Sequence, residues 1–180
     1  MSKFLYAILC LLLAACAPSA KPHITPETLL QKLAVHCGKS FSGQTIFPAD
    51  GTDPFADKAL VMQVQSCNNT EIRIPFSVGE DRSRTWVLTK TTEGLQLKHD
   101  HRHEDGTPDK ITMYGGVSKL PAYILEQRFP ADAYTAELLP AAATNEWTMA
   151  ISDDGKTFSY ILKRDGKMRY QADFDLTKPL

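Results

Sequence analysis

The C-terminal third of the chain contains two Asp-Gly pairs, and both lie between runs in which apolar and polar residues alternate. Asp154-Gly155 follows the run 147–151, and Asp165-Gly166 separates the runs 158–162 and 168–174. Asp-Gly between such runs favours a two-residue hairpin turn, because a type I′ turn needs positive φ at both central residues. Alternation with a period of two places the apolar side chains on one face of each strand. This region therefore predicts a three-stranded antiparallel meander.

Strand signals of the same kind extend back to residue 41. The chain has 180 residues, 43% of them hydrophobic, which is enough for one core and one domain. Further runs of β-branched and aromatic residues are bounded by turn-forming residues. These runs are 41–47, 59–65, 71–78, 84–89, 95–103 and 123–129, with a short one at 111–114 before Gly115-Gly116.

About nine strands in up-and-down succession are therefore expected. Such a chain either packs as a two-sheet sandwich or closes as a barrel. Hairpin connections dominate, and closure removes the exposed strand edges on which other chains can pair. The sequence thus favours a mainly β fold, an antiparallel up-and-down β-barrel, with the sandwich as the alternative. Gly115-Gly116 is expected to form a bulge or a turn.

Two short helices are expected to accompany the strands. Thr25-Pro26-Glu27 has the features of a helix start: a capping residue, a proline in the first turn and an acid near the positive end. Apolar residues recur at helical spacing up to Ala34, and Gly38 is expected to end this helix after about three turns. It would lie against the barrel or plug one end. A second helix is expected at 132–139, capped by Asp132.

Residues 1–15 have the pattern of a secretory signal peptide. Lys3 precedes an apolar run of ten residues, 4–13, which is too short to span about 30 Å of hydrocarbon. Leu13-Ala14-Ala15-Cys16 resembles the bacterial lipobox. The resemblance implies a lipoprotein with acyl chains on Cys16, a tether at 16–24 and a single barrel domain at 25–180. The alternative is a plain signal peptide cut near Ala15.

The residue after the lipobox cysteine bears on the membrane to which the protein is sent. In this class an aspartate at that position usually marks retention in the inner membrane, and here the residue is Ala17. The resemblance therefore implies a lipid anchor in the outer membrane, with the protein facing the periplasm.

The predicted location in the periplasm decides how the four cysteines are interpreted. Of the four, Cys10 leaves with the signal peptide and Cys16 carries lipid, so Cys37 and Cys67 remain. A lone pair in an oxidising compartment is most simply a disulfide. A redox or nucleophilic cysteine is the alternative, although the sequence contains no C-x-x-C motif.

The order of features is similar to that of the lipocalin-like (calycin) β-barrels. A short N-terminal helix comes first, Phe41-Ser42-Gly43-Gln44 enters the first strand, and a meander follows. The resemblance is one of architecture, and the tryptophan that such barrels usually have shortly after that glycine is absent here.

The sharpest candidate site is the run Gly94–Asp109, which contains His99, His101 and His103. On a strand these three imidazoles share the face of the leucines that precede them at positions 95 and 97. They are therefore expected to point from an apolar interior into a polar mouth.

Three roles for these histidines stay open. As metal ligands, His99 and His101 would bind zinc or copper with a further ligand such as Glu126 or Asp109. As a polar rim, they would orient an organic ligand. As structural residues, they would be half-exposed and paired with nearby acids, namely Asp100, Glu104 or Asp105.

Charge and motifs narrow the function. The net charge is −1 and no run of Lys or Arg is present, so nucleic acid is not an expected partner. No nucleophile–base pair, G-x-S-x-G motif or Walker loop is recognisable, so we do not expect an enzyme. The first hypothesis is an outer-membrane-anchored periplasmic lipoprotein that binds a small, largely apolar ligand. Its predicted ligand-binding residues are His99, His101, His103, Tyr114 and Arg128.

Two alternatives to this function remain. One is a metal-binding lipoprotein that uses the histidine strand, and no other cofactor is expected. The other is an envelope structural or protein-interaction lipoprotein, whose protein partner the sequence does not identify.

Overall fold

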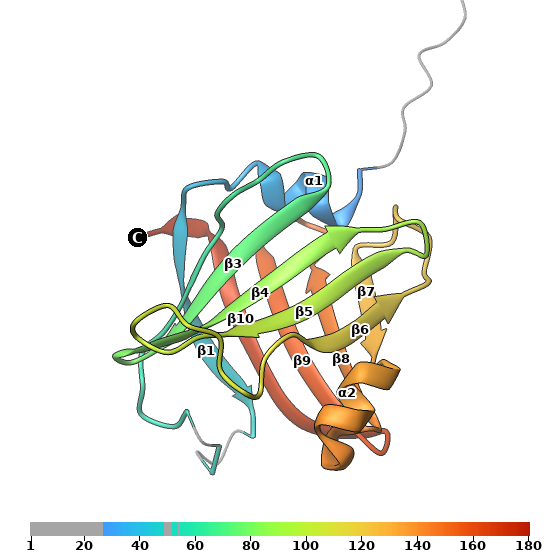
Figure 1. Ribbon diagram of the computed structural model, residues 1–180. Coiled ribbons are helices and arrows are strands. Elements are labelled where there is room, and N and C mark those ends of the chain that lie inside the picture. The colour runs from blue at the N-terminus through green and yellow to red at the C-terminus, as the bar shows by residue number, and fades with distance from the viewer. Residues whose placement is uncertain (1–26, 49–51, 54) are drawn as a thin grey trace, which may run out of the picture.

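The computed structural model describes residues 27–48, 52–53 and 55–180. Ten strands form one antiparallel sheet that curls into a nearly closed barrel, with two short α-helices (Figure 1). The mainly β barrel fold is confirmed. In chain order the elements are α1 (Leu29–Ala34), β1 (Ser40–Phe47), β2 (Leu60–Gln63), β3 (Glu71–Val78), β4 (Asp81–Lys90), β5 (Leu95–His101), β6 (Tyr114–Ser118), β7 (Glu126–Pro130), α2 (Ala133–Leu138), the 3₁₀ turn η1 (Pro140–Ala142), β8 (Asn145–Ile151), β9 (Thr157–Arg164) and β10 (Lys167–Pro179).

The strands follow one another around the barrel in an up-and-down order. The order across the sheet is β6-β5-β4-β3-β2-β1-β10-β9-β8-β7, and all neighbours are antiparallel. The first and last strands of the chain pair with each other, which joins the two meanders. The predicted three-stranded meander is confirmed as β8-β9-β10, which turns at Asp154-Gly155 and Asp165-Gly166.

The seam between β6 and β7 closes the barrel, and glycine makes this closure possible. Gly116 of β6 forms one bridge with Ala131, the residue after β7, and beside it the Asp132 N–H donates to the Gly115 carbonyl at 3.0 Å. A Cβ on Gly116 would lie 1.8 Å from the Pro130 carbonyl oxygen. Only a residue without a side chain fits this close approach.

Some predicted strand boundaries are wrong. The run 111–114 was expected to be a strand ending at a glycine bulge or turn, but β6 starts at Tyr114 and contains both glycines. The strand expected over 123–129 starts at Glu126, and Tyr123 is exposed. Both errors have one cause: pairing with the neighbouring strand, rather than local propensity, sets these limits. Tyr114 lies opposite His99 of β5, and Glu126 lies opposite Ala150 of β8.

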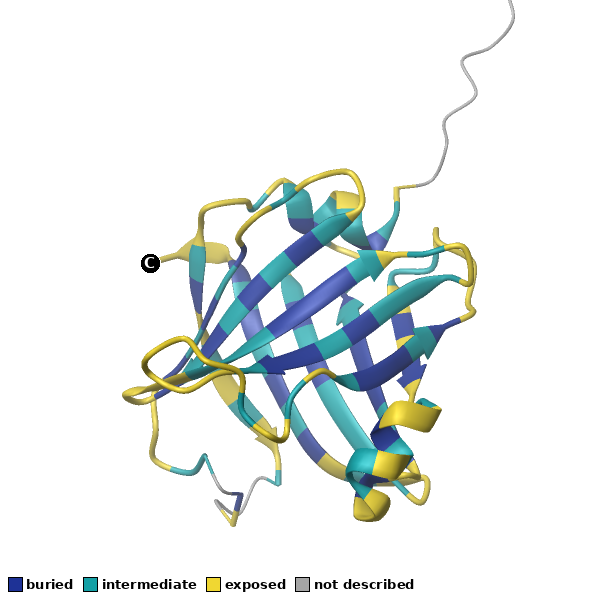
Figure 2. Cartoon of the chain, in the orientation of Figure 1, coloured by how far each residue is buried: buried dark blue, intermediate teal, exposed yellow. Residues whose placement is uncertain are grey.

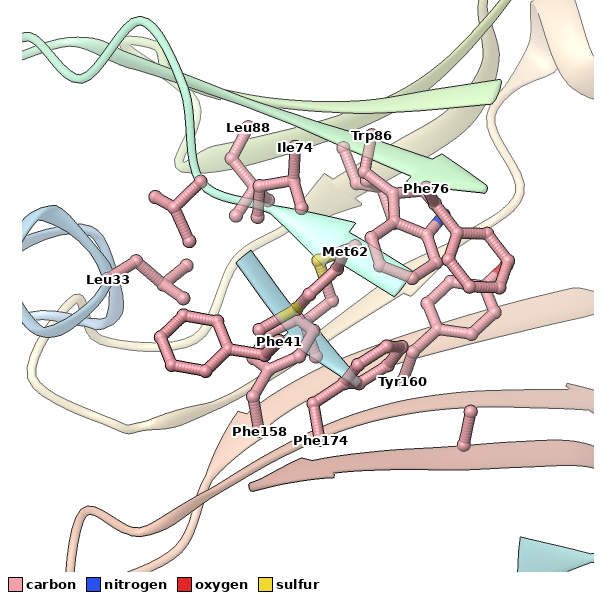
Figure 3. Packing of buried hydrophobic residues seen from close by; sticks show 14 of the residues in the cluster. Leu33, Phe41, Met62, Ile74, Phe76, Trp86, Leu88, Phe158, Tyr160 and Phe174 are labelled. Carbon is pink, nitrogen blue, oxygen red and sulfur yellow. The ribbon is translucent and has the colours of Figure 1, made fainter. Parts of the chain in front are cut away.

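Buried residues alternate with more accessible ones along the strands (Figure 2), and the buried side chains form one core cluster. Helix α1 covers one end of the barrel, as predicted, and Leu29 and Leu33 are fully buried there. Leu33 belongs to the same core cluster as Phe41 and Met62 (Figure 3). Burial of each such side chain stabilises the folded protein by about 1.5 to 3 kcal/mol, so helix α1, which plugs this end, and the barrel interior stabilise each other.

Helix α1 is shorter than predicted. Its N-cap is Thr28, whose side chain accepts a hydrogen bond from the Gln31 N–H at 3.2 Å, while the Gln31 side chain accepts one from the Thr28 N–H at 2.8 Å. The predicted start, Thr25-Pro26, lies outside the described residues. The helix ends at Ala34, because the chain turns there and the Gly38 N–H donates to the Val64 carbonyl instead.

The predicted disulfide is confirmed. Cys37 and Cys67 are bonded, with their Cα atoms 6.1 Å apart, and link the turn after α1 to the turn before β3. Their separation of 30 residues corresponds to a loop-closure stabilisation of about 3 to 4 kcal/mol. The bond therefore holds the plug on its end of the barrel.

The second helix is also confirmed. Helix α2 lies within the predicted range, and the Asp132 side chain accepts a hydrogen bond from the Thr135 N–H at 2.9 Å. The Thr135 hydroxyl bonds both backbone groups of Gly115, at 2.7 and 2.8 Å. Helix α2 thus fastens the closing strand β6.

Gly116→Ala is expected to destabilise the protein by about 1 to 3 kcal/mol, because the added methyl collides with the Pro130 carbonyl at the closing bridge. Urea unfolding monitored by tryptophan fluorescence measures this. Lys119→Ala, an exposed change just after the same strand, is the control and should stay within about 0.5 kcal/mol. Equal stability of the Gly116→Ala protein and the unaltered protein would contradict the role of the glycine.

Candidate ligand-binding pocket

Strand β5 positions the histidines. It pairs with β4 so that Leu97 lies opposite Leu88 and His99 lies opposite Trp86. Leu97 and His99 are buried, with exposed fractions of 0% and 3%, and His101 ends the strand half-buried. The expectation that the odd-numbered side chains continue the interior face is confirmed for His99 and His101. It is wrong for His103, which lies beyond the strand and is exposed, because the alternation stops where pairing stops.

Both ring nitrogens of His99 have protein partners. Nδ1 lies 3.1 Å from the Tyr114 carbonyl oxygen and Nε2 lies 2.9 Å from the Tyr160 hydroxyl. A carbonyl only accepts, so Nδ1 carries the proton and donates, and Nε2 accepts from Tyr160. The imidazole also stacks on the Tyr114 ring, with centroids 4.6 Å apart and an interplanar angle of 10°. His99 is therefore a neutral, fully satisfied wall residue.

Burial sets the electrostatics of these rings. Desolvation, together with the nearby charges of His101 and Lys98, lowers the pKa of His99 to about 3, although the hydrogen bond to the Tyr114 carbonyl acts in the opposite direction. Burial raises the pKa of Tyr114 to about 12 and raises that of Tyr160 as well. Burial and the charge of Arg84 lower the pKa of His101. At neutral pH this wall is uncharged.

A cavity of about 360 Å³ opens at the end of the barrel opposite α1. Residue Leu95 opens β5 next to α1, whereas His101 closes the same strand and lines the cavity. The floor of this cavity is an aromatic stack, in which the ring centroid of Trp86 lies 4.6 Å from that of Phe76 and 4.5 Å from that of Tyr160 (Figure 3). The remaining lining residues come from β4, β5, β6, the loop before β2, residues 139–142 and the β8-β9-β10 meander: Phe55, Arg84, His99, His101, Tyr114, Leu139, Ala142, Asn145, Trp147, Leu162, Arg164, Arg169 and Tyr170.

A second cavity, of about 580 Å³, lies beside α1. Its walls are helix α1, the turn 90–94 and loop residues near Leu120, so it is a groove over the plugged end rather than the barrel interior. The buried Gln127 borders it and uses its amide NH₂ on two loop carbonyls. We regard the first cavity, called the mouth cavity below, as the candidate site, because His99 and His101 line it and neither lines the second cavity.

The predicted site residues divide into two groups. His99, His101 and Tyr114 line the cavity together, and the Tyr114 hydroxyl lies 3.1 Å from His101 Nε2. Arg128 does not line it: its side chain is 55% exposed on the outer face and pairs with Glu126 at 2.6 Å. Assigning Arg128 to the mouth was wrong, since it alternates with the buried neighbours Gln127 and Phe129.

Sequence reasoning missed three arginines that do line the cavity: Arg84, Arg164 and Arg169. The alternation of side chains along a strand could have identified two of them, because Arg84 lies on the same face of β4 as Trp86, and Arg164 lies on the same face of β9 as Tyr160. Arg169 has no such signal. The register of β10 shifts between Met168 and Tyr170, and the exposed Arg169 lies at this irregularity and borders the cavity.

The predicted metal pair is not supported by the geometry. In the described parts of the chain, no three His, Cys, Asp or Glu side chains are grouped to hold a metal ion. The lone pair of His99 Nε2 is occupied by Tyr160. Of the suggested further ligands, Glu126 pairs with Arg128 on the outer face, and Asp109 accepts a hydrogen bond from the Ile111 N–H.

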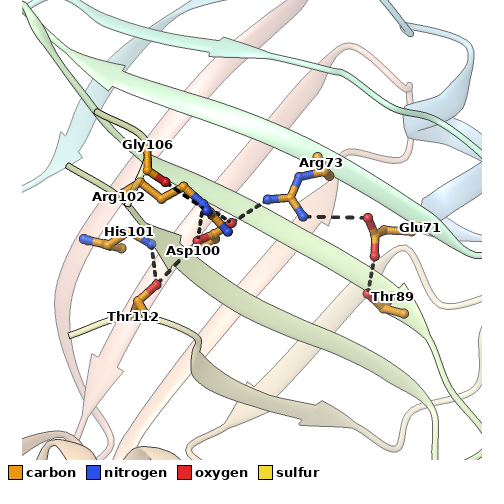
Figure 4. Close-up of polar contacts among 8 residues, drawn as sticks. All are labelled: Glu71, Arg73, Thr89, Asp100, His101, Arg102, Gly106 and Thr112. Carbon is orange, nitrogen blue, oxygen red and sulfur yellow. Dashed lines mark hydrogen bonds and ion pairs between the residues drawn. The ribbon is translucent and has the colours of Figure 1, made fainter. Parts of the chain in front are cut away.

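Asp100, on the outer face of β5, holds the side chains of two arginines (Figure 4). It is only 3% exposed, and its carboxylate lies 2.5 Å from Arg73 and 3.1 Å from Arg102. Arg102 also donates to the Gly106 carbonyl at 3.0 Å, which ties down the loop after β5. Asp100 therefore pairs with arginines, not with the histidines as the structural alternative assumed.

Comparison with known proteins gives no family: no family model matches the chain, and no curated protein matches it in sequence. Over residues 27–48, 52–53 and 55–180, no helix is long and apolar enough to cross a membrane. Function is therefore inferred from the pocket itself.

The buried neutral His99 predicts acid destabilisation. Unfolded, its imidazole takes up a proton near pH 6.5, whereas folded it stays neutral down to about pH 3. The unfolded state thus binds more protons below pH 6.5, and stability falls as the pH decreases, by about 2 kcal/mol from this residue at pH 5.

Urea unfolding at pH 7 and pH 5 tests this. The unaltered protein and the His103→Gln control, changed at an exposed loop position, should both show the loss. His99→Gln should lose about 2 kcal/mol less between the two pH values, whatever its stability at pH 7. An unchanged pH dependence in His99→Gln would contradict the assignment.

Proposed function

We propose that the protein binds a small, largely apolar ligand in the mouth of its barrel. The observation that carries this proposal is an aromatic cavity of about 360 Å³ at the end that α1 does not cover. Ligand pockets typically have volumes of about 300 to 1,000 Å³ and are mostly apolar, with a few placed polar groups. Here Trp86 and Trp147 supply apolar walls, and His101 and Tyr114 supply polar groups at the rim.

The interior polar groups support an apolar occupant. The nitrogens of His99 are already satisfied by Tyr114 and Tyr160, so this wall requires no hydrogen bond from a ligand. An apolar body is thus bound by burial against rings, and its orientation is set at the rim.

We further propose that the protein is a lipoprotein, anchored through Cys16 in the outer membrane and facing the periplasm. The support is the lipobox Leu13-Ala14-Ala15-Cys16, which lies outside the described residues, together with the disulfide between the two remaining cysteines. The tether leads into α1, which covers the end opposite the pocket. This arrangement favours a mouth that faces away from the membrane.

Native mass spectrometry of protein purified from its own envelope is expected to show a bound small molecule. Leu139→Trp, which fills the cavity, should weaken binding of that molecule by about tenfold or more, because ring and ligand compete for one space. Leu138→Trp, a neighbour that does not line the cavity, is the control. An empty cavity, or equal occupancy in both variants, would reject the proposal.

Cys16→Ser is expected to abolish lipid attachment and release the protein from the membrane fraction, since each buried CH₂ of an acyl chain contributes about 0.8 kcal/mol to membrane binding. Cell fractionation and the mass of the mature N-terminus measure this. Cys10→Ser, within the segment expected to be removed, should leave both unchanged. Membrane retention of Cys16→Ser would count against the anchor.

A further inference from the structure

The charged side chains of the mouth cavity are all of one sign. Arg84, Arg164 and Arg169 line it, and no Asp or Glu among the described residues does. The histidine wall beside them is neutral, because burial lowers the pKa of both His99 and His101. The pocket therefore combines an aromatic floor with a cationic rim.

Arg84 is the one rim arginine with a carboxylate partner. Its Nη1 lies 2.6 Å from the Asp81 side chain, and its guanidinium carbon lies 5.4 Å from the centroid of the Phe55 ring. The Asp81 carboxylate balances the positive charge of Arg84, and the two contacts fix the position of its side chain, so Arg84 forms part of the wall of the cavity.

The other two arginines retain donors for a ligand. Arg164 is half-buried and donates through Nε to the Asn145 side chain at 2.8 Å, which orients the guanidinium. Its two terminal NH₂ groups, and the whole guanidinium of Arg169, have no partner in the part of the chain that the structure describes. The nearest acid in sequence, Asp165, accepts instead from the Thr144 hydroxyl at 2.8 Å.

We infer that the ligand is an anionic amphiphile whose head group, a carboxylate or a phosphate, is bound by Arg164 and Arg169 while its apolar tail lies against the aromatic floor. This rests on the proposed function and names its ligand class. A planar guanidinium donates two parallel hydrogen bonds to such oxyanions, and these are stronger than neutral hydrogen bonds. Burial of the tail beside Trp86 and Trp147 supplies the apolar part of the affinity.

The chain contains its own reporters for this binding. It has two tryptophans, Trp86 and Trp147, and both line the cavity. Intrinsic fluorescence therefore reports occupancy without an added dye. The probes are laurate, lauryl phosphate and lauryl alcohol, which share one tail and differ in the head group. They are titrated below their micelle-forming concentrations into the full chain carrying Cys16→Ser.

The expected result is that laurate or lauryl phosphate binds more tightly than lauryl alcohol. Arg164→Gln/Arg169→Gln should weaken binding of the preferred anion by about tenfold or more and leave the alcohol unchanged. Arg128→Gln, on the outer face, is the matched control and should change neither. The anion that loses more affinity in the double variant identifies the head group.

Two other results would overturn the inference, in distinguishable ways. Equal binding of the anions and the alcohol, insensitive to both arginines, would leave the apolar pocket but remove its anionic specificity. Failure of all three probes to bind the unaltered chain would count against the inference and the proposed function together. Binding of the alcohol by the double variant also shows that this variant is folded.

Discussion

The interior of this protein depends on the close approach of β6 and β7. One bridge, between Gly116 and Ala131, joins the two ends of a ten-stranded sheet, and the carbonyl of Pro130 occupies the space that a side chain at Gly116 would fill. Without closure the sheet would present two unpaired edges, β6 and β7, and its apolar face would meet water. Helix α2 supports the seam, since Thr135 bonds both backbone groups of Gly115.

The curved sheet also explains the chemistry of the mouth. Pairing of β5 with β6 places Tyr114 opposite His99, and the curvature of the sheet brings Tyr160, on β9, to the same imidazole. A histidine with both nitrogens satisfied is stable in a dry interior only when it is neutral. The three rings therefore form a neutral wall, and the charge of the pocket comes from arginines at its rim.

Much of the fold was readable in the sequence. Alternation identified most strands, and the Asp-Gly pairs identified the β8-β9-β10 meander. Parity placed His99 inside, and applied to β4 and β9 it would also have found Arg84 and Arg164. Two predicted site residues were placed wrongly because the local pattern does not show where strand pairing stops or which face is buried. His103 lies past the end of β5, and Arg128 lies on the outer face of β7.

The sequence by itself determined the strands, the inward face of most of them, the capped helix α2 and the disulfide pair. These follow from local alternation, local capping or the counting of cysteines. Tertiary structure alone decided the start of β6 at Tyr114, the partners of His99 and the position of Arg169 at the edge of the cavity. The physical reason is that strand register, bulges and closure depend on contacts between residues far apart in the chain, which no local pattern records.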